Sequence, residues 1–507
     1  MDSYGTEDLI RELGGYGRYQ ILMTTFIHAY KAVQVFSMYA MTFAGAVPLW
    51  HCSDNINSSV NEFNDNENET IRLKACFLNG TACSAYHFDH KVNTIVSEWK
   101  LVCDFKWAPA TATTLQMTGI LIGNLAAGQI ADSIGRKPTF YLGIAWNGAS
   151  NLLAFFSVSW EMFAAARFLI GFAMGLIITV QYNLVCEFML SKWRSIVLAI
   201  PSGALFTGIY AGIAYCVLDW RYLHLITAIL GFLFLPTWQL IPESVKWYST
   251  RGRVEDAISV VRYIAKVNRR PIPDMSVISR LFKEDADEDI GTQSRKQYTI
   301  LELLRHRDIL IITLKLSALW LSFGYSFYGI TFGVSALSGD LFLNIFLMSI
   351  VEVPAQLIAL VLSNRFGRRK ATMFSVAVSG LTALGVAIVQ VIDTPLRAVV
   401  TNVCALISKL GTMAMWVSIA ALTMELYPTV VRDIGYGLQN AIARIGAMIA
   451  PQALLLSIYI PGFLYFLVCA SMFFCLLLIT TLPETKNMAL RDNMDEEFRN
   501  EMKDFKR

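Results

Sequence analysis

Three ionisable side chains, Lys31, Glu352 and Arg444, lie within long apolar stretches of the chain. Arg444 follows Arg432 by twelve residues, about 18 Å of helix, whereas the hydrocarbon layer of a membrane is about 30 Å thick. If Arg432 marks one membrane face, Arg444 lies beyond mid-depth. A charge there costs about 2.5–3.5 kcal/mol on insertion scales, which predicts a function for it. Arginine can hold a carboxylate through two parallel N–H bonds, and Glu352 could balance a cationic head group.

Polar and aromatic side chains could complete such a site. Gln356 is one helical turn from Glu352, and Asn440 is one turn from Arg444, so each pair shares a helix face. An aromatic wall could hold apolar or quaternary ammonium groups through cation–π contacts, although lipid or helix packing explains much of the aromatic content of the segment from 320 to 328. The aromatic candidates for the site are Trp320, Tyr328, Tyr210 and Trp416.

The same charges allow other interpretations. Glu352 and Arg444 could neutralise each other and form an internal lock without contacting a substrate. Lys31 could extend to the membrane surface if it lay near a helix end, but its depth makes that difficult. If Lys31 and Arg444 both face a cavity, the field there is positive and favours anions.

The composition indicates a helical membrane protein that crosses the bilayer many times. The chain has 507 residues, 55% of them hydrophobic and only 16% charged, and its mean hydropathy is +0.48. Met1 to Gln20 is polar and lacks the apolar core of a signal peptide, so the first span is expected to direct its own insertion.

Twelve transmembrane helices in two six-helix halves are expected. The spans are predicted at about 19–47, 107–130, 138–157, 160–185, 195–217, 221–241, 309–336, 340–363, 370–392, 396–423, 433–457 and 460–482. The expected regions are a cytoplasmic N-terminus at 1–18, the N-terminal half at 19–241 with an extracellular loop at 51–106, a cytoplasmic linker at 242–308, the C-terminal half at 309–482 and a cytoplasmic tail at 483–507.

Positive charges in the short loops predict the orientation, because cytoplasmic loops carry an excess of Lys and Arg. They follow the even-numbered spans, at Arg136, Lys137, Lys192, Arg194, Arg365, Arg368, Arg369, Lys370 and Arg432. Both termini are therefore expected in the cytoplasm, and the insert at 51–106 is expected outside. We expect the plasma membrane as the location.

The insert supports this orientation independently. It contains three N-glycosylation sequons, at Asn57, Asn68 and Asn79, and four cysteines, Cys52, Cys76, Cys83 and Cys103. In an oxidising compartment four clustered cysteines predict two disulfides, for which three pairings are possible. Cys76, Cys83, His87 and His90 also have a spacing that could bind zinc, but disulfides suit the compartment better. No metal is expected.

Three features recur in the same order in the two halves. GQIADSIGRK (Gly128 to Lys137) matches LSNRFGRRK (Leu362 to Lys370), and PES (Pro242 to Ser244) matches PET (Pro483 to Thr485). An acid followed seven residues later by an arginine occurs as Glu187 and Arg194, and again as Glu425 and Arg432. This parallel repeat is typical of transporters whose halves rock around a site at the bilayer midplane.

These loops are candidates for a cytoplasmic gate. Asp132 could face basic residues or a helix N-terminus across the boundary between the halves, which would hold the gate shut in one state. The alternative is that the loop charges only fix the orientation. The gating candidates are Asp132, Arg136, Glu187, Arg194, Arg368, Glu425 and Arg432.

No catalytic set is present: the six histidines are scattered, and no G-x-S-x-G, Walker A or H-E-x-x-H motif occurs. The basic residues follow the membrane topology rather than forming a patch for nucleic acid. The chain is therefore expected to be no enzyme, to need no cofactor and to bind no nucleic acid. Its expected partners are the lipid bilayer and a small organic ion.

The gate loops and the PES and PET ends resemble the major facilitator superfamily. More specific segments resemble the organic cation, anion and carnitine transporters of solute carrier family 22. These segments are GGYGRYQ (Gly14 to Gln20), TIVSEWKLVCD (Thr94 to Asp104), AGIAY and DWR within Ala211 to Arg221, PESVKWYSTRGR (Pro242 to Arg253), SGDLFLN (Ser338 to Asn344), VEVPA (Val351 to Ala355) and MELYPTVVRDIG (Met424 to Gly435). The resemblance covers essentially the whole chain.

The resemblance implies a polyspecific carrier of small organic ions that works by alternating access. The position of Arg444 tends to be acidic in cation carriers and Arg in anion and carnitine-type carriers. The resemblance matches the position of Glu352 to an acid in cation and carnitine carriers, and that of Gln356 to a position where anion carriers tend to have Lys. Tyr328 lies in span 7, which is rich in tyrosine in this family. The chain departs from the family at the gates, where Ser133 replaces a basic residue and Asn364 an acid.

Together, Arg444 and Glu352 favour a carnitine-like zwitterion as the substrate. An organic anion is the second candidate and an organic cation the third. A membrane receptor that keeps the fold without transport is the alternative from another class. Saturable uptake of a labelled organic ion would distinguish a carrier from a receptor, which would bind without flux.

Overall fold

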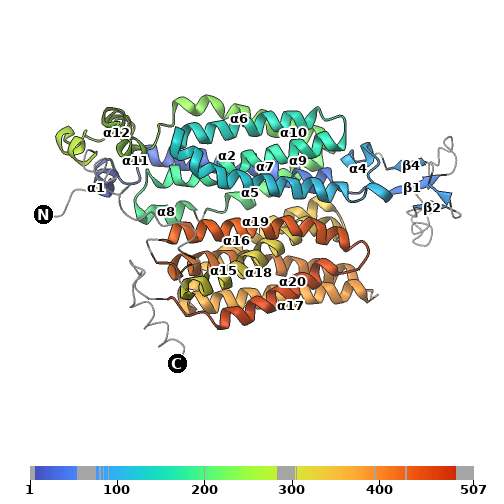
Figure 1. The fold of residues 1–507 in the computed structure, drawn as a ribbon. Coiled ribbons are helices and arrows are strands. Elements are labelled where there is room, and N and C mark those ends of the chain that lie inside the picture. The colour runs from blue at the N-terminus through green and yellow to red at the C-terminus, as the bar shows by residue number, and fades with distance from the viewer. Residues whose placement is uncertain are drawn as a thin grey trace.

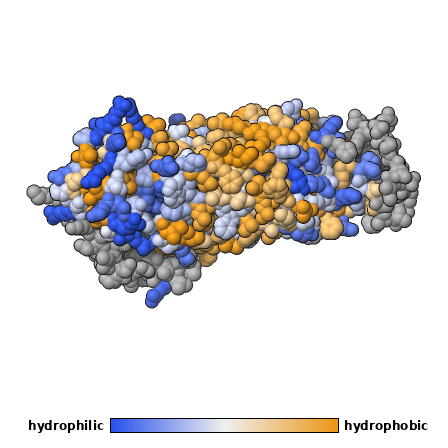
Figure 2. Space-filling model, turned by 90° about the horizontal axis from the view of Figure 1, so that it is seen from above, coloured by the Kyte–Doolittle hydropathy of each residue, from blue (hydrophilic) through white to orange (hydrophobic). Residues whose placement is uncertain are grey.

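The computed structural model describes residues 6–53, 76–78, 81–83, 85–89, 91–198, 200–282, 303, 305, 307–392, 395–428 and 431–486. Two groups of helices lie side by side, one from each half of the chain (Figure 1). On the face shown in Figure 2, a broad apolar band covers the middle of the molecule, and hydrophilic residues gather toward its two ends. Such a band between polar ends is the surface expected of a protein that spans a membrane.

The N-terminal half contains one long helix for each expected span except the fifth. These helices are α2 (Arg18–Ala44), α5 (Ala108–Ile134), α6 (Arg136–Phe155), α7 (Trp160–Cys186) and α10 (Trp220–Leu233), the last continued by a 3-10 helix at Leu235–Gln239. The boundaries follow local chemistry. Ser159 caps α7 by accepting a hydrogen bond from the Met162 N–H, and Gly135 separates α5 from α6 with φ +110°.

The fifth span is divided into α8 (Ser191–Leu198) and α9 (Ser202–Val217), with Pro201 at the start of α9. Proline has no N–H to continue the helical hydrogen bonds. The imidazole of His28 on α2 lies across this break, 2.7 Å from the Ser202 hydroxyl and 3.2 Å from the Val197 carbonyl oxygen. The sequence prediction of one continuous span over 195–217 was therefore wrong at this point.

The described residues of the C-terminal half form six long helices without such a break. They are α15 (Arg307–Phe332), α16 (Leu341–Phe366), α17 (Arg368–Val391), α18 (Arg397–Leu426), α19 (Arg432–Leu456) and α20 (Phe463–Thr480), with a 3-10 helix at Gly333–Ala336. Asp340 caps α16, and Gly367 separates α16 from α17 with φ +101°, as Gly135 does in the first half. Seven described spans are long and apolar enough to cross a membrane by composition alone. The helices α2, α5, α6 and α19 are not among them.

The polar segments lie at opposite ends of the bundle (Figure 1). One end carries α1 (Thr6–Glu12), α11 (Val245–Thr250) and α12 (Val254–Asn268). The other end carries the strands and α4 (Ile95–Glu98). Strand β1 (Trp50–Ser53) pairs antiparallel with β4 (Ala85–Phe88), and β2 (Phe77–Leu78) pairs antiparallel with β3 (Thr81–Ala82).

The four cysteines of this loop form two disulfides, Cys52–Cys83 and Cys76–Cys103, which selects one of the three possible pairings. Because both thiols of the possible zinc set, Cys76 and Cys83, are used in separate disulfides, they cannot ligate a metal together. The sequons at Asn57, Asn68 and Asn79 lie outside the described residues, and so does His90.

Glycines let the helices approach closely within each half. A Cβ atom added at Gly119 or Gly123 of α5 would lie 2.2 Å from a carbonyl oxygen of α7. In the other half, a Cβ added at Gly324 of α15 would lie 1.9 Å from the Ala443 oxygen of α19, and one added at Gly446 would lie 2.2 Å from the Leu321 oxygen. Only glycine permits this backbone contact, as in other membrane helix pairs with small residues at the interface.

The two halves meet along α5 with α19 and along α9 with α16. The Thr114 hydroxyl donates to the Met448 carbonyl oxygen at 3.2 Å and accepts from the Gln452 amide at 3.0 Å. Phe43 stacks on Phe342 across the same boundary with ring centroids 5.5 Å apart. These contacts lie toward the end that carries the strands, so the described halves are held together at that end.

Candidate functional site

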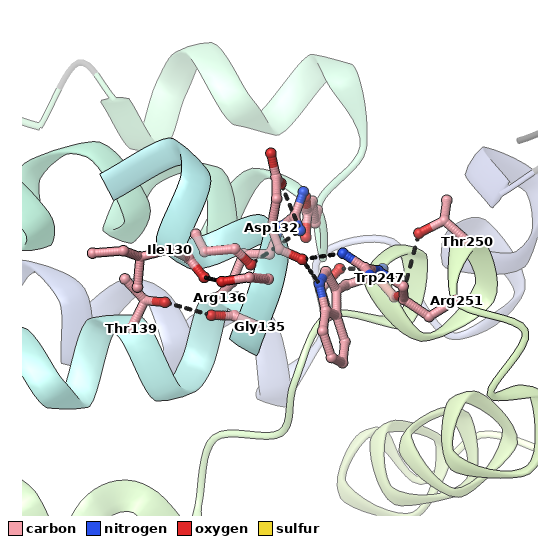
Figure 3. A network of polar contacts seen from close by, with 12 residues as sticks. Ile130, Asp132, Gly135, Arg136, Thr139, Trp247, Thr250 and Arg251 are labelled. Atoms are coloured by element: carbon pink, nitrogen blue, oxygen red, sulfur yellow. Dashed lines mark hydrogen bonds and ion pairs between the residues drawn. The ribbon is translucent and has the colours of Figure 1, made fainter. Parts of the chain in front are cut away.

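The first gate loop joins α5 to α6 at the end of the bundle that carries α11 (Figure 3). The Arg136 guanidinium lies 3.2 Å from Asp132 and 3.5 Å from Glu187 at the end of α7. The carboxylate of Glu243, from the PES motif, accepts hydrogen bonds from the backbone N–H groups of Arg136 and Lys137. It therefore caps the N-terminus of α6, where a helix attracts negative charge. Burial raises the pKa of Glu243, and these N–H donors oppose that rise.

The second gate loop repeats this arrangement. Arg368 donates to Glu425 at 3.0 Å, as Arg136 approaches Glu187. Glu484 of the PET motif accepts from the backbone N–H of Arg368 at 2.7 Å, as Glu243 does from Arg136. The Thr485 hydroxyl adds a further hydrogen bond to Glu425. The sequence repeat is thus a structural repeat in which acid, arginine and capping glutamate have equivalent partners.

The gate partners differ from those suggested by sequence spacing. Glu187 pairs with Arg136 of the neighbouring loop, while Arg194 donates to the carbonyl oxygens of Cys186 and Met189. Asp132 contacts Arg136 in its own loop and is 69% exposed, and within the described residues no contact of its side chain with the other half replaces this one, although such a contact was expected. Arg194 lies in α8, and its guanidinium stabilises free carbonyl groups at and just after the C-terminal end of α7, which spacing alone does not reveal.

The first half adds contacts at Asp132 that involve the segment after the PES motif. The Trp247 indole N–H donates to the Asp132 carbonyl oxygen at 3.2 Å, and Arg251 donates to the same oxygen (Figure 3). α11 is thereby attached to the end of α5. We expect the first gate loop to depend less on a single ion pair than the second.

This difference leads to a prediction for the two gates. Glu425→Ala is expected to lower the free energy of unfolding by about 1–3 kcal/mol, because it removes the carboxylate partner of Arg368 and leaves only neutral hydrogen-bond acceptors among the described residues. The matched change Glu187→Ala should cost less, since its ion pair with Arg136 is 3.5 Å long. Thermal denaturation of the purified variants measures both, and a larger loss for Glu187→Ala would contradict the inferred order.

The central candidate Arg444 lies on α19, and its side chain is half-buried. Its guanidinium donates to the Tyr328 hydroxyl of α15 and lies 5.8 Å from the Tyr328 ring centroid. The close approach of α15 and α19 at Gly324 and Gly446 brings the two side chains together. Among the residues that the structure describes, no carboxylate lies within ion-pair distance of Arg444.

Lys31 has a similar environment in the first half. Its ammonium donates to the Tyr182 hydroxyl of α7 at 3.0 Å and lies 5.7 Å from the Tyr182 ring centroid. Its side chain also approaches Gly203, just after the break between α8 and α9. Within the described part of the chain, Lys31 has no carboxylate partner either, so its charge is stabilised by a tyrosine, as that of Arg444 is.

Glu352 is buried and forms an ion pair with Lys409 of α18 at 3.0 Å, not with Arg444. The interpretation of an internal lock between Glu352 and Arg444 was therefore wrong. The Lys409 ammonium is fully enclosed: it donates to the Thr331 hydroxyl at 2.6 Å and lies 3.5 Å from the centre of the Phe327 ring. A buried charge with an acidic, a hydroxyl and an aromatic partner is well satisfied.

Sequence reasoning missed Lys409 although the signal was available. Lys409 stands inside the predicted span at 396–423, and an ionisable residue within an apolar span is the criterion that selected Arg444. Arg167 of α7 was missed for the same reason. It is buried, and donates to the Ser37 carbonyl oxygen at 3.1 Å and to the side chain of Gln116.

The ion pair lies beside a small cavity between the halves. Tyr39 and Thr207 line it from the first half, and Ser349, Glu352 and Lys409 line it from the second. Its volume of about 10 Å³ is roughly that needed for one water molecule. A substrate would need the halves to move apart here, as expected of a carrier whose halves rock.

The remaining candidates for substrate binding lie in different environments, some buried between helices and some partly exposed. Trp320 is buried and donates its indole N–H to Thr423 at 3.0 Å, and Tyr210 is buried and stacks on Phe36. Both therefore pack between helices in this state. Gln356 is half-buried on α16, and Asn440 donates to the Tyr436 carbonyl oxygen at 3.0 Å. Trp416 is 37% exposed on α18.

Comparison with known proteins identifies the family. Residues 77–451 match the family model described as Major Facilitator Superfamily. The chain belongs to the major facilitator superfamily. It is 31% identical to organic cation/carnitine transporter 2 of Rattus norvegicus, covering 82% of this chain and 73% of that protein. It is 30% identical to solute carrier family 22 member 21 of Mus musculus, covering 81% and 72%. Within the superfamily it is a member of solute carrier family 22.

Other relatives span nearly the whole chain. The organic cation transporter protein of Drosophila melanogaster is 28% identical, covering 97% of this chain and 94% of that protein. The inward-open xylose transporter XylE from E. coli matches the fold with a TM-score of 0.65 and 13% identity, covering 93% of this chain and 98% of that one. The chain is therefore a multi-pass membrane transporter that works by alternating access, as the sequence predicts, and not an enzyme.

Proposed function

We propose that the chain carries small organic ions that bear a carboxylate, and that Arg444 binds this carboxylate. The observation that carries the proposal is the half-buried guanidinium of Arg444, which lies in a membrane helix and has a tyrosine but no described carboxylate as its partner. An intramembrane charge needs a partner or a function. A substrate carboxylate would supply that partner, and could accept two parallel N–H bonds from the guanidinium.

A carnitine-like zwitterion is the first substrate class. Tyr328 holds Arg444, and the Phe327 and Phe332 rings contact Tyr328, so aromatic faces lie next to the cation that would bind the carboxylate. Such faces attract a quaternary ammonium group. The relative in Rattus norvegicus is named an organic cation/carnitine transporter, which supports this class.

The organic anion is the second class, and one specific observation favours it. Glu352 is neutralised by Lys409 and is less available to balance a cationic head group than its sequence position suggests. Lys31 and Arg444 both lack described carboxylate partners, so the central region carries excess positive charge. Substrate competition must decide between a zwitterion and a simple anion.

Competition of labelled-carnitine uptake by carnitine-like, dicarboxylate and quaternary ammonium compounds tests the proposal. In cells expressing Arg444→Asp we expect carboxylate-bearing competitors to lose potency by about tenfold or more, because a hydrogen bond to a charged group is worth about 1.5–3 kcal/mol. Arg397→Gln, at the exposed start of α18, is the matched control and should keep the wild-type order. An unchanged order in Arg444→Asp would make the assignment wrong, and binding without flux would indicate a receptor.

We further propose a plasma-membrane location with both termini in the cytoplasm. The two disulfides at one end of the bundle and the basic gate loops at the other support this orientation. The sequons at Asn57, Asn68 and Asn79 would then carry glycans. In the same cells, glycosidase treatment is expected to lower the mass of the wild-type protein but not that of the triple Asn→Gln variant. An unchanged wild-type mass would count against the proposed orientation.

A further inference from the structure

A hollow of about 350 Å³ opens at the end of the bundle that carries the strands, well away from Arg444. Its walls come from both halves of the chain. Asp104, Lys106 and Trp107 lie in the segment leading into α5, and Tyr459 follows the end of α19. The Cys76–Cys103 disulfide borders the hollow and fixes the segment before Asp104. A volume of this size falls within the range of small-molecule sites, about 300–1,000 Å³.

The charges in the hollow are of both signs and remain available. The Lys106 ammonium lies 4.0 Å from the Tyr459 ring centroid and, in the described part of the chain, has no carboxylate partner. Asp104 is exposed and forms no ion pair with any described residue. A ligand with an anionic and a cationic group could therefore satisfy Lys106 and Asp104 together.

The aromatic residues add selectivity for the cationic group. Trp107 is 40% exposed and packs edge-on against Trp160, which holds its ring in place. With Tyr459 from the second half, two aromatic side chains border the hollow. Such rings bind quaternary ammonium groups in many proteins. The combination of lysine, aspartate and aromatic rings matches a phosphocholine group.

The surroundings point to the membrane as its source. Exposed apolar side chains flank the hollow on both halves: Phe105, Leu456, Ile458 and Ile460. Tryptophan and tyrosine beside such residues are typical of the membrane–water boundary. A lipid could place its head group in the hollow and its acyl chains against these side chains.

We propose that this hollow is a binding site for a phosphocholine head group that stabilises the closed arrangement of this end of the carrier. Lys106 belongs to the first half and Tyr459 to the second, so their contact is lost if the halves separate here. A ligand that needs both walls binds the closed state better and shifts the population toward it. The lipid would thus slow opening at this end without touching the central site.

The test uses the purified full-length protein in a maltoside detergent with sn-glycero-3-phosphocholine as the probe. We expect a saturable rise in melting temperature, with the apparent dissociation constant about two- to fivefold higher in Tyr459→Leu and in Lys106→Gln. Lys100→Gln, which changes an exposed lysine of the same segment, should titrate like the wild type. The absence of any rise, or identical curves in the two hollow variants and the wild type, would overturn the proposal.

A second arm separates the two sources of phosphocholine. In proteoliposomes, initial uptake should differ between phosphatidylcholine and phosphatidylglycerol vesicles in the wild type but not in Tyr459→Leu if a lipid occupies the site. Equal rates in both lipids, with inhibition by added glycerophosphocholine that Tyr459→Leu removes, would assign the site to a soluble ligand. If uptake showed neither a dependence on the lipid nor inhibition by glycerophosphocholine, the proposal would be overturned. The melting measurement needs no transport, and the comparison of the two hollow variants with the wild type separates binding in the hollow from binding at the central site.

Discussion

Lys409→Met is expected to destabilise the folded carrier by about 3–5 kcal/mol, because it leaves the carboxylate of Glu352 buried without its cation. The two side chains are 3.0 Å apart, and only 1% of the Lys409 side chain and 9% of the Glu352 side chain are exposed. Glu352→Gln should be costly for the same reason, since it strands the ammonium between Thr331 and the Phe327 ring. Thermal denaturation of the purified variants measures the loss.

The double variant is the control for this interpretation. Replacing both partners removes both buried charges, so Glu352→Gln with Lys409→Met should recover most of the stability that either single change loses. If the double variant were as unstable as the sum of the two single variants, the ion pair would not be the reason for their loss. Uptake by the double variant would show whether the pair also serves transport.

Gly324→Ala is expected to prevent the correct packing of α15 against α19 and to destabilise the protein by more than about 3 kcal/mol. The added Cβ would lie 1.9 Å from the backbone oxygen of Ala443, and backbone atoms cannot move away as a flexible side chain can. The change should also separate Tyr328 from Arg444, because the glycine contact determines how closely their helices approach.

Gly437→Ala is the matched control for this prediction. Gly437 also lies in a helix of the second half, but a Cβ atom there would meet nothing within 4 Å. The yield of monodisperse protein after detergent extraction should fall sharply for Gly324→Ala and remain near wild type for Gly437→Ala. Equal yields would show that the close approach of the helices is not required.

The membrane class and the repeat could be predicted from the sequence because both depend on local pattern. Long apolar runs, loop charges and the duplicated motifs with Gly135 and Gly367 identify the helices, the gate loops and the superfamily. The break between α8 and α9 was missed because the apolar run continues through Pro201. A hydropathy pattern reports burial in the bilayer and not the continuity of a helix.

The partners of the charged residues could not be predicted, because they depend on which helices become neighbours. Glu352 and Lys409 are 57 residues apart, and their contact depends on the packing of α16 against α18. The partners of Glu187 and Glu425 depend on helix packing in the same way, because each acid contacts an arginine from another loop, Arg136 or Arg368. Arg444 and Tyr328 were proposed separately as candidates for one site, and the structure brings their side chains into contact.

The two halves therefore repeat the gate contacts but not the charged residues at the centre. The gates contain equivalent ion pairs and capping glutamates in both halves. The central charges do not occupy matching positions of the repeat. Lys31 on α2 and Arg444 on α19 each contact a tyrosine of their own half, whereas Glu352 and Lys409 neutralise each other. Symmetric gating around an asymmetric site is consistent with a carrier whose halves move alike but contribute differently to substrate choice.

The central claim is that Arg444 binds the carboxylate of the substrate, and a paired-ligand experiment tests it most directly. Inhibition of labelled-carnitine uptake by carnitine and by carnitine amide, in which an uncharged primary amide replaces the carboxylate, is compared in the wild type and in Arg444→Gln. The account predicts a wild-type preference for the carboxylate of about tenfold or more, which Arg444→Gln abolishes. A carboxylate preference of the same size in Arg444→Gln would contradict the account.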